Sequence, residues 1–73
     1  MNELSQEERN TLESMIDTSD VATVLRALAL VCIEKSEHMQ VNWQDKPAAR
    51  RWDRAHKALM RASESAAIAE VSP

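Results

Sequence analysis

Apolar positions recur at alternating steps of four and three residues in two segments of the chain. The members in the first segment, where one lysine interrupts them, are Val21, Leu25, Leu28, Cys32, Lys35 and Met39. Those in the second segment are Ala48, Trp52, Ala55, Leu59, Ala62, Ala66 and Ala69. On an α-helix such positions share one face, so the pattern predicts an all-α protein built on an antiparallel helical hairpin, with helices at about 20–41 and 46–69.

Polar residues mark where these helices begin. The first long helix should begin at Ser19 or Asp20, because several side chains in the run 17–20 can accept bonds from its first backbone amides. Asp45 and Pro47 suit the start of the second long helix. Upstream, Ser5 and Glu8 have the spacing of a capping box and predict a short N-terminal helix over about 6–16. We expect one small domain over 1–73, with fraying of residues 1–4 and 70–73.

An antiparallel hairpin that turns near residue 44 brings definite positions together. Large side chains of the first long helix should meet the alanine-rich face of the second, because small residues let two helices approach closely. The contacts expected from this register are Met39 and Lys35 with Trp52 and Ala55, and Cys32 with Leu59.

The first long helix is apolar over roughly 200° of its circumference, about twice the stripe of an ordinary surface helix. It therefore needs two neighbours. The second long helix can cover one side; the other side should meet the N-terminal helix, a second copy of the chain or a foreign partner. The positions expected in the core or the oligomer contact are Val21, Leu25, Leu28, Cys32, Ile33, Met39, Trp52 and Leu59. Leu30 lies outside this arc and is a candidate partner contact.

A chain of 73 residues has a thin core, since a domain of this size buries only about 60% of the surface of its unfolded chain. Cys32 is the only cysteine, so no disulfide can form within the chain, and no cluster of Cys and His suggests structural zinc. Self-association is the remaining common means of stabilisation. We expect a homo-oligomer, most simply a two-fold dimer that forms a helical bundle.

Composition narrows the functional classes. The chain has no glycine, which excludes glycine-rich phosphate loops and dinucleotide fingerprints. The apolar run 27–33 is too short to span a bilayer, so we expect no membrane partner and a cytoplasmic location. A lone thiol agrees with a reducing compartment.

Charge is distributed unevenly along the chain. Residues 1–20 contain six acids and one base, whereas residues 46–73 contain six bases and three acids. Four of these bases recur at steps of four and three on one helix face: Arg50, Arg54, Lys57 and Arg61. Such a row can bind nucleic-acid phosphates or simply form a solvated outer face. We favour the solvated face, and we prefer an acidic protein surface to nucleic acid as the partner that these bases would meet.

Trp43 stands in the short polar connection between the two long helices. Its indole either folds back over the end of the hairpin or projects as an anchor for a partner. The sequence favours the first alternative. In both cases Trp43 is a candidate functional residue, for stability if it is buried and for binding if it is exposed.

Candidates for chemistry are sparse. Asp53 and His56 have the spacing of half a carboxylate-bridged metal site, but His38 lacks the matching acid three residues before it. Cys32 lies within the apolar pattern, where a thiol behaves as a small hydrophobe. We therefore expect no enzyme, no cofactor and no metal site.

The sequence thus suggests a small regulatory protein, such as an inhibitor, that acts by occluding or scaffolding a larger protein. Its expected partner-binding residues are Trp43, Arg50, Arg54, Lys57, Arg61 and Leu30. Two alternatives stay open: a nucleic-acid-associated accessory protein that uses the basic face, and a structural subunit of a helical assembly.

Overall fold

The computed structural model describes residues 2–71, and the regular structure in that range is entirely helical. Its elements are α1 (Gln6–Thr18), α2 (Val21–Val41), α3 (Lys46–Ser63) and the single turn α4 (Ala66–Ala69). The all-α prediction is confirmed, and α1, α2 and α3 each begin within one residue of the expected start, whereas α4 was not expected as a separate helix. Of the ends expected to fray, residues 1, 72 and 73 lie outside the described range.

Local hydrogen bonds explain these starting points. The Ser5 hydroxyl accepts from the backbone N–H of Glu8, and the Glu8 carboxylate accepts from the backbone N–H of Ser5 at 2.8 Å, which completes the capping box. Asp20 and Asp45 each accept from the backbone N–H three residues further on. Pro47 occupies the first turn of α3, where no intrahelical donor is needed.

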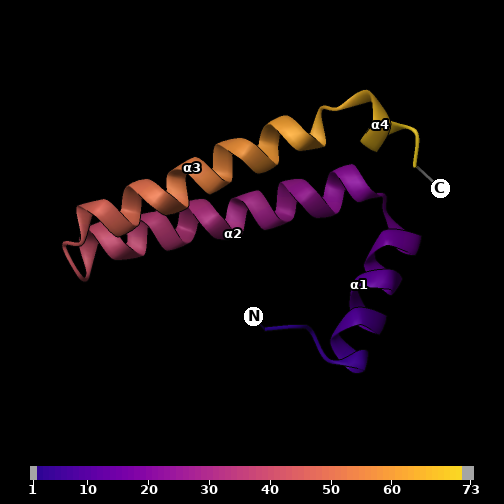
Figure 1. Ribbon diagram of the computed structural model, residues 1–73, viewed down its shortest axis with the longest axis horizontal. Helices are drawn as coiled ribbons and strands as arrows, with labels where there is room; N and C mark the ends of the chain where they lie inside the picture. The colour runs from indigo at the N-terminus through magenta and orange to yellow at the C-terminus, as the bar shows by residue number, and fades with distance from the viewer. Residues whose placement is uncertain (1, 72–73) are drawn as a thin grey trace.

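Helices α2 and α3 lie side by side and run in opposite directions (Figure 1). Two hydrogen bonds define their register. The Ser36 hydroxyl donates to the carbonyl oxygen of Ala49 at 2.7 Å, and Nδ1 of His56 lies 2.8 Å from the carbonyl oxygen of Ala29. Since Ala29 and Ser36 are two helical turns apart, as are Ala49 and His56, both bonds belong to one regular antiparallel contact.

The register differs from the one expected from the sequence. Cys32 lies between the levels of the two interhelical bonds and so opposite the middle of α3, well short of Leu59. Leu28 and Lys35 are exposed, whereas their neighbours Ala29 and Ser36 are buried. The residues of α2 that face α3 are therefore not all those of the expected seam. At alternate positions the contact moves on by one residue, from Leu28 to Ala29 and from Lys35 to Ser36.

Small side chains explain this rotation. The buried residues within the described range are Ala29, Cys32, Ser36, Ala48, Ala49 and Ser63. None is larger than cysteine, so the two helix backbones approach closely, and larger apolar side chains flank the contact as half-buried residues. The core of the single chain is consequently narrow.

The second long helix is shorter than predicted, because α3 ends at Ser63. The Ser63 hydroxyl donates to the carbonyl oxygen of Met60, and the backbone N–H groups of Glu64 and Ser65 each bond three residues back. Such bonds tighten the last turn, and serine side chains compete with the helical backbone bonds. Ser65 then adopts an extended conformation before α4, which contacts both α2 and α3.

Helix α1 stands away from the α2–α3 pair at a steep angle (Figure 1). It contacts α2 near the end where the two helices join, and within the described residues it makes no contact with α3. The radius of gyration is 14.1 Å, compared with roughly 11 Å for a compact domain of this length. The single chain is therefore open.

Candidate functional site

The most extensive candidate surface is an apolar row on α2 that α3 does not cover. We call it the uncovered stripe: Val21, Val24, Leu28 and Val31, at steps of three and four. Leu28 and Val31 are 48% and 47% exposed, while the two valines nearer the start of α2 are half-buried. The wide apolar arc of α2 thus has one side packed against α3 and another side that is half-buried near the start of the helix and open at Leu28 and Val31.

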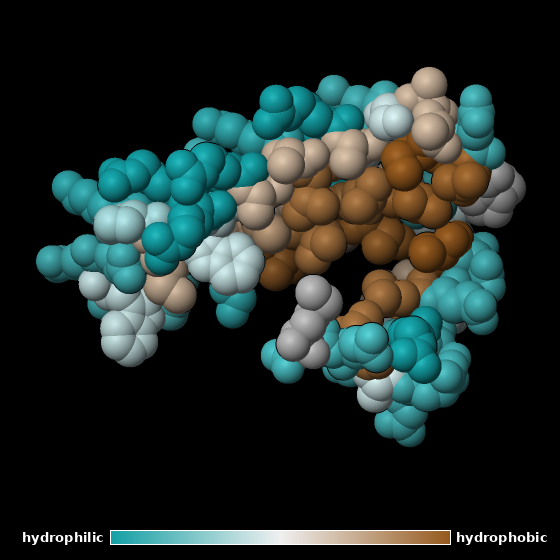
Figure 2. Space-filling model, in the orientation of Figure 1, coloured by the Kyte–Doolittle hydropathy of each residue, from teal (hydrophilic) through white to brown (hydrophobic). Residues whose placement is uncertain are grey.

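Helix α1 presents a second apolar surface to the same open space. Leu12 is 37% exposed and Met15 is 48% exposed, and Ile16, close to the junction with α2, is half-buried. Figure 2 shows apolar surface along α2 and on the facing side of α1, with a hollow between them. The open side of α2 is therefore not covered by the N-terminal helix, which was one of the three neighbours considered for it.

The predicted basic residues lie on α3. Arg50, Arg54, Lys57 and Arg61 are all exposed, and their spacing places them on one face of the helix. Lys57 forms an ion pair with Asp53 at 3.2 Å, one turn earlier on the same helix. We call these four residues the basic row.

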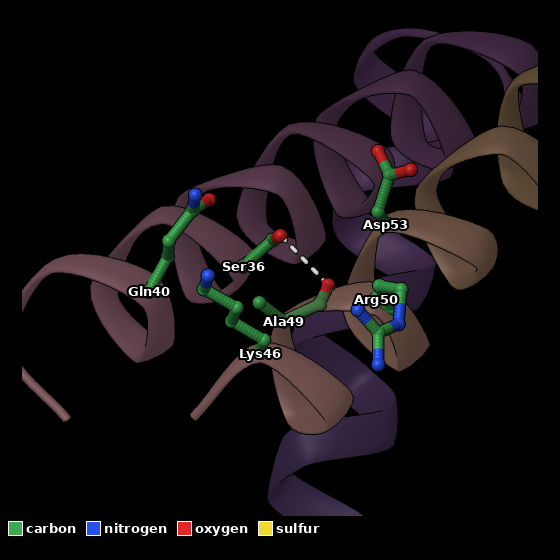
Figure 3. Close-up of a pocket in the computed structure, with 6 residues that line it drawn as sticks. All are labelled: Ser36, Gln40, Lys46, Ala49, Arg50 and Asp53. Atoms are coloured by element: carbon green, nitrogen blue, oxygen red, sulfur yellow. Dashed lines mark hydrogen bonds between the residues drawn. The ribbon is translucent and has the colours of Figure 1, made fainter. Parts of the chain in front are cut away.

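A shallow groove of about 310 Å³ runs between α2 and α3 beside the basic row (Figure 3). Its lining residues are Ser36, Gln40, Lys46, Ala49, Arg50 and Asp53. The Ser36 hydroxyl is already engaged with the Ala49 carbonyl, and the Asp53 carboxylate is paired with Lys57. The remaining polar groups of the lining are the Gln40 amide and two cations, Lys46 and Arg50. Such an open polar groove suits a single acidic side chain better than an enclosed substrate. The sequence did not indicate it, because it depends on the register of the two helices.

Trp43 projects from the connection between α2 and α3. Its side chain is 68% exposed, so the expectation that it folds over the end of the hairpin is wrong. Its Nε1–H donates to Nε2 of His38 at 3.1 Å, while Nδ1 of His38 lies 2.7 Å from the side-chain nitrogen of Asn42. These contacts fix the indole on the outside of the turn.

Leu30 is 57% exposed, but it does not belong to the uncovered stripe. At 100° per residue it points about 160° away from Leu28. The structure therefore separates the predicted partner-binding residues into three places: the basic row on α3, Trp43 at the turn, and Leu30 on α2.

The residues predicted for the core or the oligomer contact differ in how far they are buried. Cys32 is buried in the α2–α3 contact, and Leu28 is exposed on the uncovered stripe. The other six are half-buried: Val21, Leu25, Ile33, Met39, Trp52 and Leu59.

The titratable side chains are dispersed over the described part of the chain. Nowhere in residues 2–71 do three His, Cys, Asp or Glu side chains gather as metal ligands would. His56 bonds to the Ala29 carbonyl and so belongs to the helix contact, with its Nδ1 carrying the proton that the carbonyl accepts. Between residues 2 and 71, no helix combines the length and the apolar character needed to cross a bilayer.

Comparison with known proteins identifies no relative: no protein-family model matches the chain, and neither a curated protein nor a solved structure is significantly similar to it.

Proposed function

We propose that the protein is a non-enzymatic binding module that self-associates and acts by occluding or scaffolding a larger protein partner. In this proposal the apolar side of α2 and α1 makes the contact between copies, and the basic row with Trp43 meets the partner. Its single cysteine agrees with action in the cytoplasm, which is the location that we propose.

The observation that carries the proposal is the apolar surface left open by α1 and α2. The chain exposes 5791 Å², whereas a compact monomer of 8.2 kDa exposes roughly 4,500 Å². The excess, roughly 1,250 Å², exceeds the 800 Å² or so that each partner buries in a standard protein–protein interface. Contiguous exposed apolar surface on a small protein is typical of an interaction site.

The partner side of the proposal rests on charge and on Trp43. The basic row is exposed along α3, and Arg50 also borders the groove between α2 and α3. Arginine and tryptophan are the residues most enriched among interface hot spots. An acidic protein surface would complement this face and would be drawn to it by electrostatic steering.

Capture experiments with matched variants test the partner side. The immobilised chain should capture a protein from the native host, and Arg54→Glu or Trp43→Ala should abolish that capture. Arg26→Glu, a similar charge reversal at an exposed position on α2, should leave it unchanged. Equal capture by all variants would contradict the assignment of the basic row and Trp43 to the partner contact.

Nucleic acid is the second candidate partner, because four cations share one exposed face of α3. A duplex bound at low salt, with affinity that falls steeply as salt rises and with loss of binding in Arg54→Glu and Lys57→Glu, would favour that function. Absence of duplex binding at low salt would exclude the nucleic-acid-binding function. Growth of the particle beyond a dimer in sedimentation would instead favour a structural subunit of a helical assembly.

A further inference from the structure

The hollow between α1 and α2 has a shape and a charge distribution that indicate what fills it. We propose that it receives α2 of a second copy, in a two-fold dimer in which the two uncovered stripes pack antiparallel and each α1 crosses over the other chain. This inference deepens the self-association part of the proposed function and rests on it. It does not depend on the identity of the partner protein.

Helix α1 is held in a position from which it can reach a second chain. The Ser19 backbone N–H bonds to the Met15 carbonyl and closes α1, and Asp20 caps α2 through the N–H of Thr23 at 2.7 Å. Only two residues, Ser19 and Asp20, separate the helices, and both take part in these end contacts. Since the junction is ordered by its own hydrogen bonds, α1 extends from α2 as an arm with its apolar side towards the hollow (Figure 2).

The arm has the length that such a crossing requires. Its 13 residues span about 20 Å, which is about two interhelical distances of 8–10 Å. An isolated helix of this length is marginal in water, so α1 needs an apolar surface against which to pack. The second copy supplies that surface.

The uncovered stripe is self-complementary when two copies run antiparallel. If Val24 of one α2 faces Leu28 of the other, two-fold symmetry places Leu28 opposite Val24. The same register places Val21 opposite Val31 at both ends. Every residue of the uncovered stripe then meets another apolar residue, as in a heptad seam.

The distribution of charge favours the antiparallel arrangement of the two α2 helices over a parallel arrangement. The stripe continues into Lys35, one turn beyond Val31, and the antiparallel register brings Lys35 to the α1–α2 junction of the second copy, at Asp17. The same crossing brings the acidic α1 close to the N-terminal half of α3 in the other chain, where Arg50 and Arg51 lie. A parallel arrangement would instead place the two acidic arms side by side, with repulsion between like charges.

Sedimentation velocity across a series from nanomolar to high micromolar concentration tests the proposal, with helicity followed by circular dichroism. The wild-type chain should dimerise. Leu28→Glu should weaken dimerisation by roughly 30-fold or more, because a central apolar contact becomes a buried charge. Leu30→Glu is the matched control, since this exposed leucine lies on another side of α2, and it should dimerise as the wild type does.

A charge exchange tests the register independently of any loss of folding in Leu28→Glu. Lys35→Glu and Asp17→Lys should each weaken the dimer, and the double variant should restore it. A wild-type chain that stays monomeric at high micromolar concentration would overturn both the inference and the self-association that it rests on. A dimer that tolerates Leu28→Glu, or one that the double exchange fails to restore, would overturn this arrangement and leave self-association standing.

Discussion

The hydroxyl of Ser36 donates a hydrogen bond of 2.7 Å to the carbonyl oxygen of Ala49, and both residues are buried where α2 and α3 meet. The bond links residues that are 13 positions apart and fixes the relative height of the two helices. The side chains at this point must be small, because each helix backbone lies close to the other.

Substitutions of Ser36 should separate the hydrogen bond from the packing. Ser36→Ala should lower the free energy of unfolding by about 1 kcal/mol, through loss of one hydrogen bond. Ser36→Leu should lower it by a further 1–3 kcal/mol or so, because the longer side chain forces the helices apart. Urea unfolding measures both values. A Ser36→Leu variant as stable as Ser36→Ala would show that the close helix approach is wrong.

The two tryptophans should respond differently to truncation. Trp43 is exposed at the turn, so Trp43→Ala should change the free energy of unfolding by less than about 0.5 kcal/mol. Trp52 is half-buried beside the α2–α3 contact, so Trp52→Ala should lower the free energy of unfolding by about 2 kcal/mol or more. Thermal melts followed by circular dichroism distinguish the two variants. A large loss of stability in Trp43→Ala would place its indole inside the fold.

Asp20 predicts a dependence of stability on pH. Hydrogen bonding by Thr23, first through its side chain and then through its backbone N–H, lowers the pKa of Asp20 from its ordinary value of 3.8, with a smaller contribution from the charge of Arg26. Because the folded-state pKa lies below the unfolded one, the carboxylate stabilises α2 above pH 3.8 or so, and this stabilisation is lost as the pH falls through the folded-state pKa.

Asp20→Ala should therefore melt at a lower temperature than the wild type at neutral pH, and the difference should shrink as the pH falls below 3.8. Asp20→Asn is the control, since an asparagine side chain can still accept from the Thr23 N–H but does not titrate. Melts of the three proteins between pH 7 and pH 2.5 or so supply the comparison. A pH-independent difference between Asp20→Ala and the wild type would contradict the ionised cap.

Gln44 is the described non-glycine residue with a positive φ, at 51°. Left-handed backbone costs a residue with a Cβ about 1 kcal/mol relative to glycine. Gln44→Gly should therefore be more stable than the wild type by up to about 1 kcal/mol, less the entropy that glycine adds to the unfolded chain. Gln44→Ala, which keeps the Cβ, should show no such gain in chemical denaturation. Equal stability of the glycine and alanine variants would contradict a left-handed turn at this position.

The sequence predicted the helices well because their starting points are fixed locally. Ser5, Asp20 and Asp45 each bond to a backbone N–H three residues away, and this chemistry can be read without knowledge of the fold. The sequence predicted too long a helix at α3. The alanine-rich run favours helix strongly, and the serines at 63 and 65 were too weak a signal to place the end at Ser63.

The register was missed for a tertiary reason. Hydrophobicity ranks Leu28 above Ala29 as a core residue and gives no reason to bury Ser36, so the expected seam contained the large residues. Close approach of two helices reverses that ranking, since only small side chains fit between them. The sequence did contain a second row at the same spacing, which marks the face of α2 that the structure packs against α3: Ala22, Leu25, Ala29, Cys32, Ser36 and Met39.

The candidate site was predictable only in outline. The width of the apolar arc of α2 indicated a second neighbour, and the spacing of Arg50, Arg54, Lys57 and Arg61 indicated an exposed basic row. The groove lined by Gln40 and Lys46 depends on the register and could not be read from the sequence. The direction of α1 depends on the Ser19–Asp20 junction, for which no periodic pattern exists.

The small size of the buried side chains has a calorimetric consequence. The heat capacity change of unfolding grows with the apolar area that becomes exposed, and a core that contains nothing larger than Cys32 exposes little. Melting of the separate chain would therefore absorb little heat and extend over a wide temperature range. Burial of Leu28 and Val31 against another molecule would enlarge the enthalpy of unfolding and sharpen the transition.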